Sequence, residues 1–278
     1  GGAIYNQNGT ITVNNSIFSN NIGDPLMNSV AGGIYNNGIM NISDSTFSNN
    51  NAHGGGGAIF HASGTLTITN SNFSGNSING YGGDGGGIEN HGSLTITNSS
   101  FLNNSAQSGG AIYNIGTLGN LTVSDSTFSN NSAQDGSGIF NYGTLEVTNS
   151  TFSSNGTSSY SSSYGGGISN YETATIIDSA FLENFAYTGG GIYNWSALTI
   201  EKSTFYGNEA AWGGGLSSAI DINNNSSVTI TNSVFTGNSA VHPGSYGGIR
   251  SVTMRTLQKA VEFILLRFIS ALCPNWYH

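Results

Sequence analysis

Charged side chains are scarce in this sequence, since only 7% of its 278 residues are Asp, Glu, Lys or Arg. Bases are the scarcest: residues 1–249 contain 13 acids and a single Lys or Arg, Lys202. A body without a basic face cannot neutralise the phosphates of DNA or RNA. The sequence therefore predicts no nucleic acid among its partners.

Cysteine and helical periodicity are also missing. Cys273 is the only cysteine, which excludes a disulfide within the chain. In residues 1–249 apolar residues do not recur at spacings of three and four, and the 42 glycines of the chain penalise a helix further. Although Gly, Asn and Ser are abundant, hydrophobic residues still make up 36% of the chain, enough for an ordered interior.

One pattern, Phe-x-x-Asn, occurs nine times, and a Ser stands two residues before every Phe. A fixed period of this kind is typical of a solenoid, in which identical residues of successive coils stack in columns. We therefore expect a structural Phe column and a structural Asn column. Their members are Phe18, Phe47, Phe73, Phe101, Phe128, Phe152, Phe181, Phe205 and Phe235, followed by Asn21, Asn50, Asn76, Asn104, Asn131, Asn155, Asn184, Asn208 and Asn238.

Two further segments complete each repeat. Upstream of the Phe lies a Gly-rich stretch that ends in Ile, and between the two a segment such as residues 66–70 (Leu-Thr-Ile-Thr-Asn) alternates apolar and polar residues. That alternation is typical of a strand with one buried face. Each repeat thus offers three short strands, and stacked parallel coils are nearly always right-handed. The fold class predicted is all-β, a right-handed parallel β-helix of about ten coils over residues 1–249.

The paired signatures also resemble those of a known family. Gly-Gly-Ala-Ile at residues 1–4, 56–59 and 109–112, together with Phe-x-x-Asn, resembles the repeats of the chlamydial polymorphic outer-membrane proteins, although other copies here, such as residues 85–88, have Gly-Gly-Gly-Ile. The resemblance covers residues 1–249. It implies a β-helical passenger domain displayed at the bacterial cell surface, with adhesion as the usual role.

Strand parity turns the residue after each Ile outward, and this position is mostly aromatic. Glu89 and Ser169 interrupt the file. Outward rings can stack on sugars or on another protein, so we predict ligand binding here; covered by a loop or a neighbouring chain, the same rings would be ordinary packing. The predicted ligand-binding residues are Tyr5, Tyr35, Phe60, Tyr113, Phe140 and Tyr193.

One corner of the coil is enlarged by insertions at residues 22–32, 77–86, 156–166 and 239–247. Protruding loops on a rigid scaffold are common binding sites, and tolerated extra length is the alternative. The outward Thr columns of the middle strands, among them Thr67 and Thr69, suggest ice binding as another hypothesis. Glu146, Ile177 and Glu201 interrupt those columns.

Candidate catalytic and metal residues are few. Asp44, Asp125 and Asp178 all stand three residues before a Phe, where Asn is usual, so we interpret them as substitutes for Asn in a corner ladder. Glu89 and His91, with His61 one coil earlier, lack a further pair of metal ligands and are interpreted as surface polar residues. Asp84 lies in a Gly-rich turn, residues 82–85, that faintly resembles a calcium-binding turn but occurs once. We predict no catalytic residue, metal or cofactor.

Residues 250–278 depart from the repeat. They hold four of the five bases, and apolar residues recur there at helical spacing. An amphipathic cap helix that covers the end of the solenoid is one interpretation; an aberrant, out-of-frame tail is the other. Arg267 interrupts the apolar run, which is too short to span a bilayer.

The sequence thus predicts a non-catalytic repeat segment of a longer bacterial protein, since the chain begins within a repeat. It would lie at the cell surface or outside the cell and serve in adhesin-like binding or structural display. The expected partner is a protein, a glycan or another copy of the chain. The alternatives are a polysaccharide-active enzyme, either a lyase or a glycosidase, and an ice-binding protein.

Overall fold

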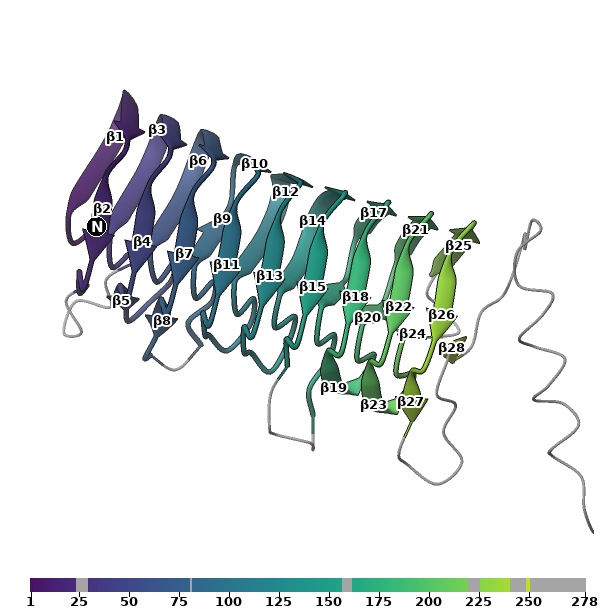
Figure 1. Ribbon diagram of the computed structural model, residues 1–278. Coiled ribbons are helices and arrows are strands. Elements are labelled where there is room, and N and C mark those ends of the chain that lie inside the picture. The colour runs from purple at the N-terminus through teal and green to yellow at the C-terminus, as the bar shows by residue number, and fades with distance from the viewer. Residues whose placement is uncertain (24–29, 81, 157–161, 220–225, 241–248, 251–278) are drawn as a thin grey trace, which may run out of the picture.

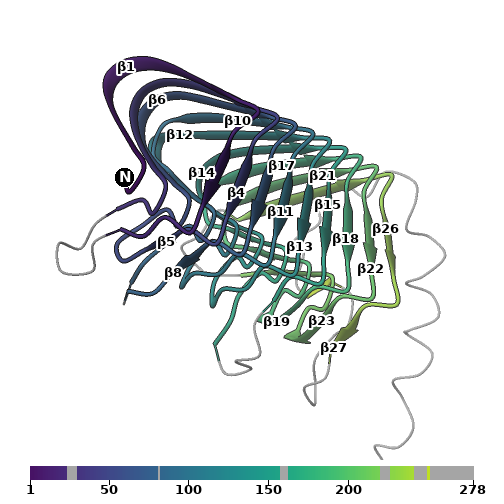
Figure 2. The same cartoon turned by 60° about the vertical axis from the view of Figure 1, so that its left-hand side comes forward.

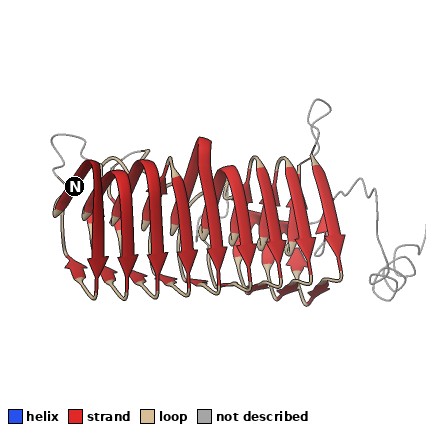
Figure 3. Cartoon of the chain, turned by 90° about the horizontal axis from the view of Figure 1, so that it is seen from above, coloured by secondary structure: helices blue, strands red, loops and turns tan. Residues whose placement is uncertain are grey.

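The computed structural model describes residues 1–23, 30–80, 82–156, 162–219, 226–240 and 249–250. These residues form a rod of stacked coils that begins at the N-terminus and adds one coil per repeat (Figure 1). Seen from above, successive strands lie side by side along the rod (Figure 3). All strand pairs are parallel, each strand joining its counterpart in the next coil.

The Phe-centred strands form a nine-stranded sheet along one side of the rod. Each has three residues with the Phe in the middle, and the Phe pairs with the Phe of the next coil. The strands are β2 (Ile17–Ser19), β4 (Thr46–Ser48), β7 (Asn72–Ser74), β11 (Ser100–Leu102), β13 (Thr127–Ser129), β15 (Thr151–Ser153), β18 (Ala180–Leu182), β22 (Thr204–Tyr206) and β26 (Val234–Thr236).

The Ile strands and middle strands together form a 14-stranded sheet on the other side (Figure 2). In four coils they are separate strands, as the sequence predicts. These are β9 (Ile88–Asn90) with β10 (Ser93–Thr97), β16 (Ile168–Asn170) with β17 (Thr173–Ile177), β20 (Ile192–Asn194) with β21 (Ala197–Glu201), and β24 (Leu216–Ser218) with β25 (Ser227–Thr231); the short β28 (Ile249–Arg250) follows.

In the other five coils the two strands merge into one, which differs from the expected three short strands. The ladder continues through the corner because register shifts absorb the extra residues there, for example between Gln7 and Thr10. The merged strands are β1 (Ile4–Asn14), β3 (Ile34–Ser43), β6 (Ile59–Thr69), β12 (Ile112–Ser124) and β14 (Ile139–Thr148).

Short strands also form at the enlarged corner. They are β5 (Asn51–Ala52) paired with β8 (Ser77–Ile78), and β19 (Phe185–Thr188), β23 (Glu209–Trp212) and β27 (Ser239–Ala240) in a second small sheet. Residues 24–29, 81, 157–161 and 241–248 of the predicted insertions lie outside the described residues. The link between β24 and β25, which is not among these insertions, is also long.

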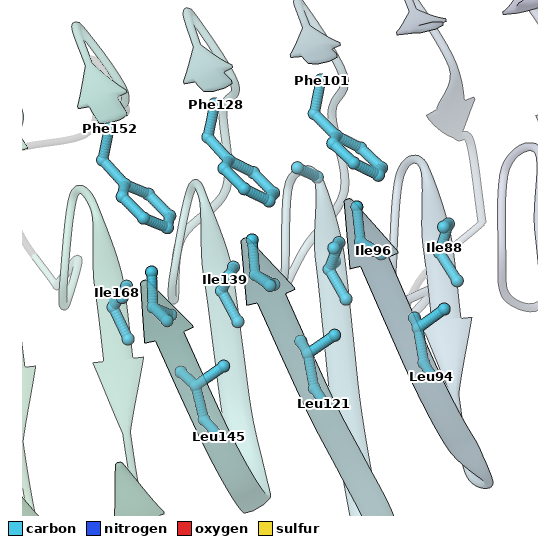
Figure 4. Packing of buried hydrophobic residues seen from close by; sticks show 14 of the residues in the cluster. Ile88, Leu94, Ile96, Phe101, Leu121, Phe128, Ile139, Leu145, Phe152 and Ile168 are labelled. Carbon is cyan, nitrogen blue, oxygen red and sulfur yellow. The ribbon is translucent and has the colours of Figure 1, made fainter. Parts of the chain in front are cut away.

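Four apolar columns fill the interior, as Figure 4 shows for part of the rod: one of Phe, one of Ile from the Ile strands, and two from the middle strands. Neighbouring Phe rings are stacked with centroids 4.3 to 4.9 Å apart and planes within 7° of parallel. From Phe47 to Phe205 every ring in this column is fully buried. Burying one such ring stabilises the fold by about 1.5 to 3 kcal/mol, so the aromatic column is a principal source of stability.

Amide ladders run beside the apolar columns. In the Phe-x-x-Asn column each Asn Nδ2 donates to the Oδ1 of the next Asn at 2.7 to 3.0 Å, from Asn21 to Asn238. The same Nδ2 also donates to a Phe carbonyl, as Asn131 does to Phe101. These bonds satisfy buried corner groups that no strand partner reaches.

Left-handed residues close the corner before each Phe strand. The residue three before the Phe has φ between 45° and 52° in all nine coils. Asn and Asp tolerate that conformation better than other residues with a side chain, which explains why they hold eight of the nine positions. Lys202 holds the ninth.

The parallel β-helix predicted from the sequence is confirmed. Nine Phe strands make nine coils, close to the expected ten, and β28 starts the next. No helix among the described residues is long and apolar enough to cross a membrane. The predicted cap or tail at residues 251–278 lies outside the described residues.

Candidate functional site

A sharp corner precedes the Ile strand, and in seven coils a glycine with positive φ forms it. The glycine stands three residues before the Ile or Leu that begins the strand and has φ between 58° and 70°. A Cβ there would come close to the carbonyl oxygen of that Ile or Leu, which favours glycine; Ala31, with φ of 67°, holds the equivalent position before Ile34. These glycines are Gly56, Gly85, Gly109, Gly136, Gly165, Gly189 and Gly213.

This corner turns two rows of side chains toward each other. One is the outward file that follows the Ile; the other, here called the facing row, lies five residues earlier. A Cβ on Gly55 would overlap the carboxylate of Glu89, and the ring of Tyr164 lies 4.8 Å from that of Tyr193. Parallel pairing joins the facing row from coil to coil. Its members are Val30, Gly55, Asp84, Ser108, Asp135, Tyr164, Thr188 and Trp212.

Large and small side chains alternate between the two rows. Tyr113 in the file faces Ser108, whereas Ser169 in the file faces Tyr164. The aromatic group therefore changes rows where the file is interrupted by Ser169. The surface stays aromatic along the rod although the file itself does not.

The predicted file is less exposed than parity suggested. Tyr5 is 60% exposed, but Tyr35, Phe60, Tyr113 and Phe140 are half-buried. The rings stack on one another along the rod, with centroids 4.7 Å apart for Tyr5 and Tyr35 and 4.8 Å for Tyr113 and Phe140. Stacking along the rod axis covers ring faces and leaves ring edges outward.

Tyr193 requires a correction, because it is buried, with 6% of its surface exposed. It points to the outward side, in register with Ser169. Tyr164 and Tyr171 lie against it, with ring centroids 4.8 and 5.9 Å away. The interpretation of the file as packing under neighbouring side chains therefore holds at this position.

A third row of rings was missed by the sequence reasoning. It stands two residues beyond the file, on the same side by strand parity, and includes His91, Tyr142 and Tyr171. The alternation of inward and outward residues along the strand, which predicts the file, also predicts this row. The aromatic strip, as used below, comprises Tyr5, Tyr35, Phe60, His91, Tyr113, Phe140, Tyr142, Tyr164, Tyr171, Tyr193 and Trp195.

Three carboxyl groups lie within the strip. Burial raises the pKa of Asp84 and of Asp135 to about 6, and raises the pKa of Glu89. Glu89 also accepts a hydrogen bond from His91 at 2.7 Å, and the charges of Asp84 and Glu89 add to burial in raising the pKa of Tyr113. Sequence reasoning missed this cluster because Asp84 and Asp135 are 51 residues apart and meet only through the facing row.

The strip is negatively charged, since Lys202 lies elsewhere. Lys202 is at the corner before a Phe strand, where its Nζ lies 3.1 Å from a carboxylate oxygen of Glu201. It is the only Lys or Arg in residues 1–249. The strip therefore favours cationic or neutral ligands over anionic ones.

The other candidate residues behave as structural parts. Asp44 and Asp125 accept hydrogen bonds from Asn70 and Asn149 at 3.2 and 2.6 Å, as substitutes for Asn would. His61 is not beside His91 at the surface but fully buried, where its Nδ1 accepts from an Asn of the interior ladder. No group of three His, Cys, Asp or Glu side chains in the described part of the chain could hold a metal ion.

Two other predicted surfaces are present in part. The Thr columns align, with Thr67 paired to Thr95 and Thr95 to Thr122, until Glu146 follows. At the enlarged corner there is a hollow of about 430 Å³. Its lining residues are Asn20, Ile22, Gly23, Asn49, Asn51, His53 and Asn79.

Comparison with known families matches this architecture. A family model for the right handed beta helix region matches residues 87–257, more than half of the chain. A model for the Chlamydia polymorphic membrane protein repeat matches residues 44–62, which include one Phe-x-x-Asn and one Gly-rich Ile segment. No curated protein and no solved structure matches the chain. The chain belongs to the right handed beta helix family, and residues 44–62 are similar to the repeat of the Chlamydia polymorphic membrane proteins.

Proposed function

We propose that this β-helix is a non-catalytic segment displayed outside a bacterial cell, where the aromatic strip binds a partner in the manner of an adhesin. The polymorphic membrane protein repeat at residues 44–62 supports display. The observation that carries the binding role is the strip itself: rings and carboxyl groups gathered on the outside of coils whose interior is already filled.

Packing of the coils does not account for the aromatic residues of the strip. The coil itself does not require an aromatic residue at an outward position, yet each of the eight coils from Tyr5 to Tyr193 has at least one ring in the strip, and the last three of them have two. Contiguous apolar surface with a polar border is typical of interaction sites. Because the stacked rings present edges and hydroxyl groups, the strip suits a partner that combines apolar contact with hydrogen bonding.

A binding screen tests this proposal. The purified chain is applied to arrays of glycans and of extracellular proteins, and ligands are then compared between two variants. Tyr113→Ala combined with Tyr142→Ala removes two rings of the strip, and we expect it to abolish binding. Tyr206→Ala is the matched control, since Tyr206 is 51% exposed on the Phe-strand side of the rod. Equal loss in both variants, or no ligand at all, contradicts the proposal.

A polysaccharide-active enzyme is the second candidate, and one observation favours it. Asp84 and Asp135 lie two coils apart in the facing row, roughly 9 to 10 Å at the usual spacing of strands. Burial holds the pKa of each at about 6, which suits a general acid near neutral pH. Release of reducing or unsaturated ends from neutral or acidic polysaccharides, with and without calcium and lost in Asp135→Asn, would establish it and refute the non-catalytic proposal.

A further inference from the structure

Asp135 differs from the other carboxyl groups of the strip in having an unsatisfied oxygen. Its Oδ1 is buried and has no hydrogen-bond partner, and the Oγ of Ser169 in the next coil is in the same condition. Among the described residues these are two of the three side-chain atoms so placed. Ser169 is fully buried in the outward file. A buried polar atom without a partner costs free energy, so it marks a place where a ligand group can gain.

The rings beside Asp135 are inclined, unlike the stacks elsewhere in the strip. Tyr171 is tilted by 31° against Phe140 and by 61° against Tyr193, and Tyr164 by 49° against Tyr193. The stacked ring pairs along the file have interplanar angles of 10° to 18°, and away from Asp135 the ring of His91 is also inclined, by 39° to Phe60. Beside Asp135 the cause is Ser169: its small side chain leaves room between the rings of Phe140 and Tyr193, so the rings of Tyr164 and Tyr171 lie over it.

Negative charge is concentrated at the same place. The charge of Asp84, two coils away, adds to burial at Asp135, and the charge of Asp135 adds to burial in raising the pKa of Tyr171 and Tyr193. Within residues 1–249 the one Lys or Arg, Lys202, lies at a different corner. A cation bound here would meet ring faces, one unpaired carboxylate and no competing base.

We propose that Asp135 and three rings near it, those of Phe140, Tyr164 and Tyr171, bind an alkylated ammonium group carried by the partner. The proposal rests on the proposed binding function and specifies its ligand chemistry. Inclined ring faces attract a cation through their quadrupoles, and a quaternary ammonium has no N–H donors to satisfy. The single carboxylate supplies the counter-charge. A divalent metal would need several more oxygen ligands.

Titration of the full chain with choline and with tetramethylammonium, followed by calorimetry and by the NMR signals of the tyrosine rings, tests this site. The control probe is 3,3-dimethylbutan-1-ol, which has the shape of choline without its charge. We expect saturable binding of both cations and none of the alcohol. Asp135→Asn and Tyr171→Ala should each weaken binding about tenfold, the equivalent of about 1.4 kcal/mol. Asp125→Asn, which removes an exposed carboxylate at the Asn corner, should leave binding unchanged.

Two outcomes overturn the ammonium site: equal binding of the alcohol, or equal affinity in Asp135→Asn and Asp125→Asn. Thermal melts of each variant show whether a loss of binding reflects unfolding. The array experiment separates this inference from the proposed function. A partner that binds through Tyr113 and Tyr142 but is indifferent to Asp135→Asn, in a chain that binds no ammonium, refutes the ammonium site alone. Ammonium binding without any partner on the arrays refutes the proposed function alone.

Discussion

The interior columns and the aromatic strip follow opposite rules. In two interior columns the same residue recurs in every coil: nine Phe and nine Asn occupy equivalent positions without exception, with ring spacings that vary by 0.6 Å and amide bonds that vary by 0.3 Å. Outside, the file position holds Tyr, Phe, Glu or Ser. The difference shows that stacking fixes the interior, whereas nothing in the coil requires the composition of the strip.

The largest effect should come from the interior. Phe128→Ala removes a ring stacked between Phe101 and Phe152 at 4.9 and 4.6 Å. Because the rigid coils on either side cannot close the cavity, we expect the free energy of unfolding to fall by about 3 to 5 kcal/mol. Urea melts followed by circular dichroism measure the loss.

Tyr206→Ala tests an aromatic residue that points outward from a Phe-centred strand, for comparison with the buried Phe128. The Tyr206 ring is half exposed, so the substitution should change stability by no more than about 0.5 kcal/mol. A loss below about 1 kcal/mol for Phe128→Ala would refute the claim that the interior columns hold the rod together.

The division between inside and outside also explains what the sequence could predict. Phe128 and Asn131 were placed correctly because identical residues at a fixed offset can only stack. The partnership of Asp84 with Asp135 was not visible, since it depends on the facing row, which becomes adjacent to the file only after the glycine corner forms. His61 was misplaced because it stands in an Asn column, one residue beyond the file.

Within the strip, Asp135→Asn should have a smaller effect on stability than Phe128→Ala, and the effect should be stabilising. Burial raises the pKa of Asp135 from an ordinary 3.8 to about 6, so the folded chain binds this proton more tightly than the unfolded chain does. The contribution of Asp135 to stability is therefore most favourable below about pH 4, declines as the pH rises to about 6, and stays lower above that. Asp135→Asn should stabilise the fold by about 1 to 2 kcal/mol at pH 7.5 and have little effect at pH 3.5.

Melts of Asp135→Asn at both pH values check this, with Asp125→Asn as the exposed control. Asp84 and Tyr171 interact electrostatically with Asp135. The change in the stability effect of Asp135→Asn between the two pH values is therefore more informative than the effect at either pH alone. A variant that is less stable than the parent at pH 7.5 would show that the carboxylate serves the fold, and the contrast between the two regions would fail at this position.

His61 offers a test from the inside. Asn36 Nδ2 lies 2.9 Å from its Nδ1, which leaves the proton on Nε2, and that nitrogen is fully buried without a partner. The ladder therefore stops at His61 and resumes at Asn90. His61→Asn should restore the bond to Asn90 and raise stability by about 1 kcal/mol. His53→Asn, at a half-buried corner, should have no effect; equal changes in both would show that the ladder is not the cause.

The smallest change in stability is expected from substitutions at the corner before the Phe strands. Lys202 has φ of 48° there, and its ion pair with Glu201 is exposed and contributes little. Because Asn adopts the left-handed conformation at lower cost, Lys202→Asn should raise the melting temperature by roughly 1 to 3 °C. The reverse change one coil further, Asn232→Lys at φ of 51°, should lower it by a similar amount. If both changes lower the melting temperature, the left-handed backbone conformation is not what selects Asn at this corner.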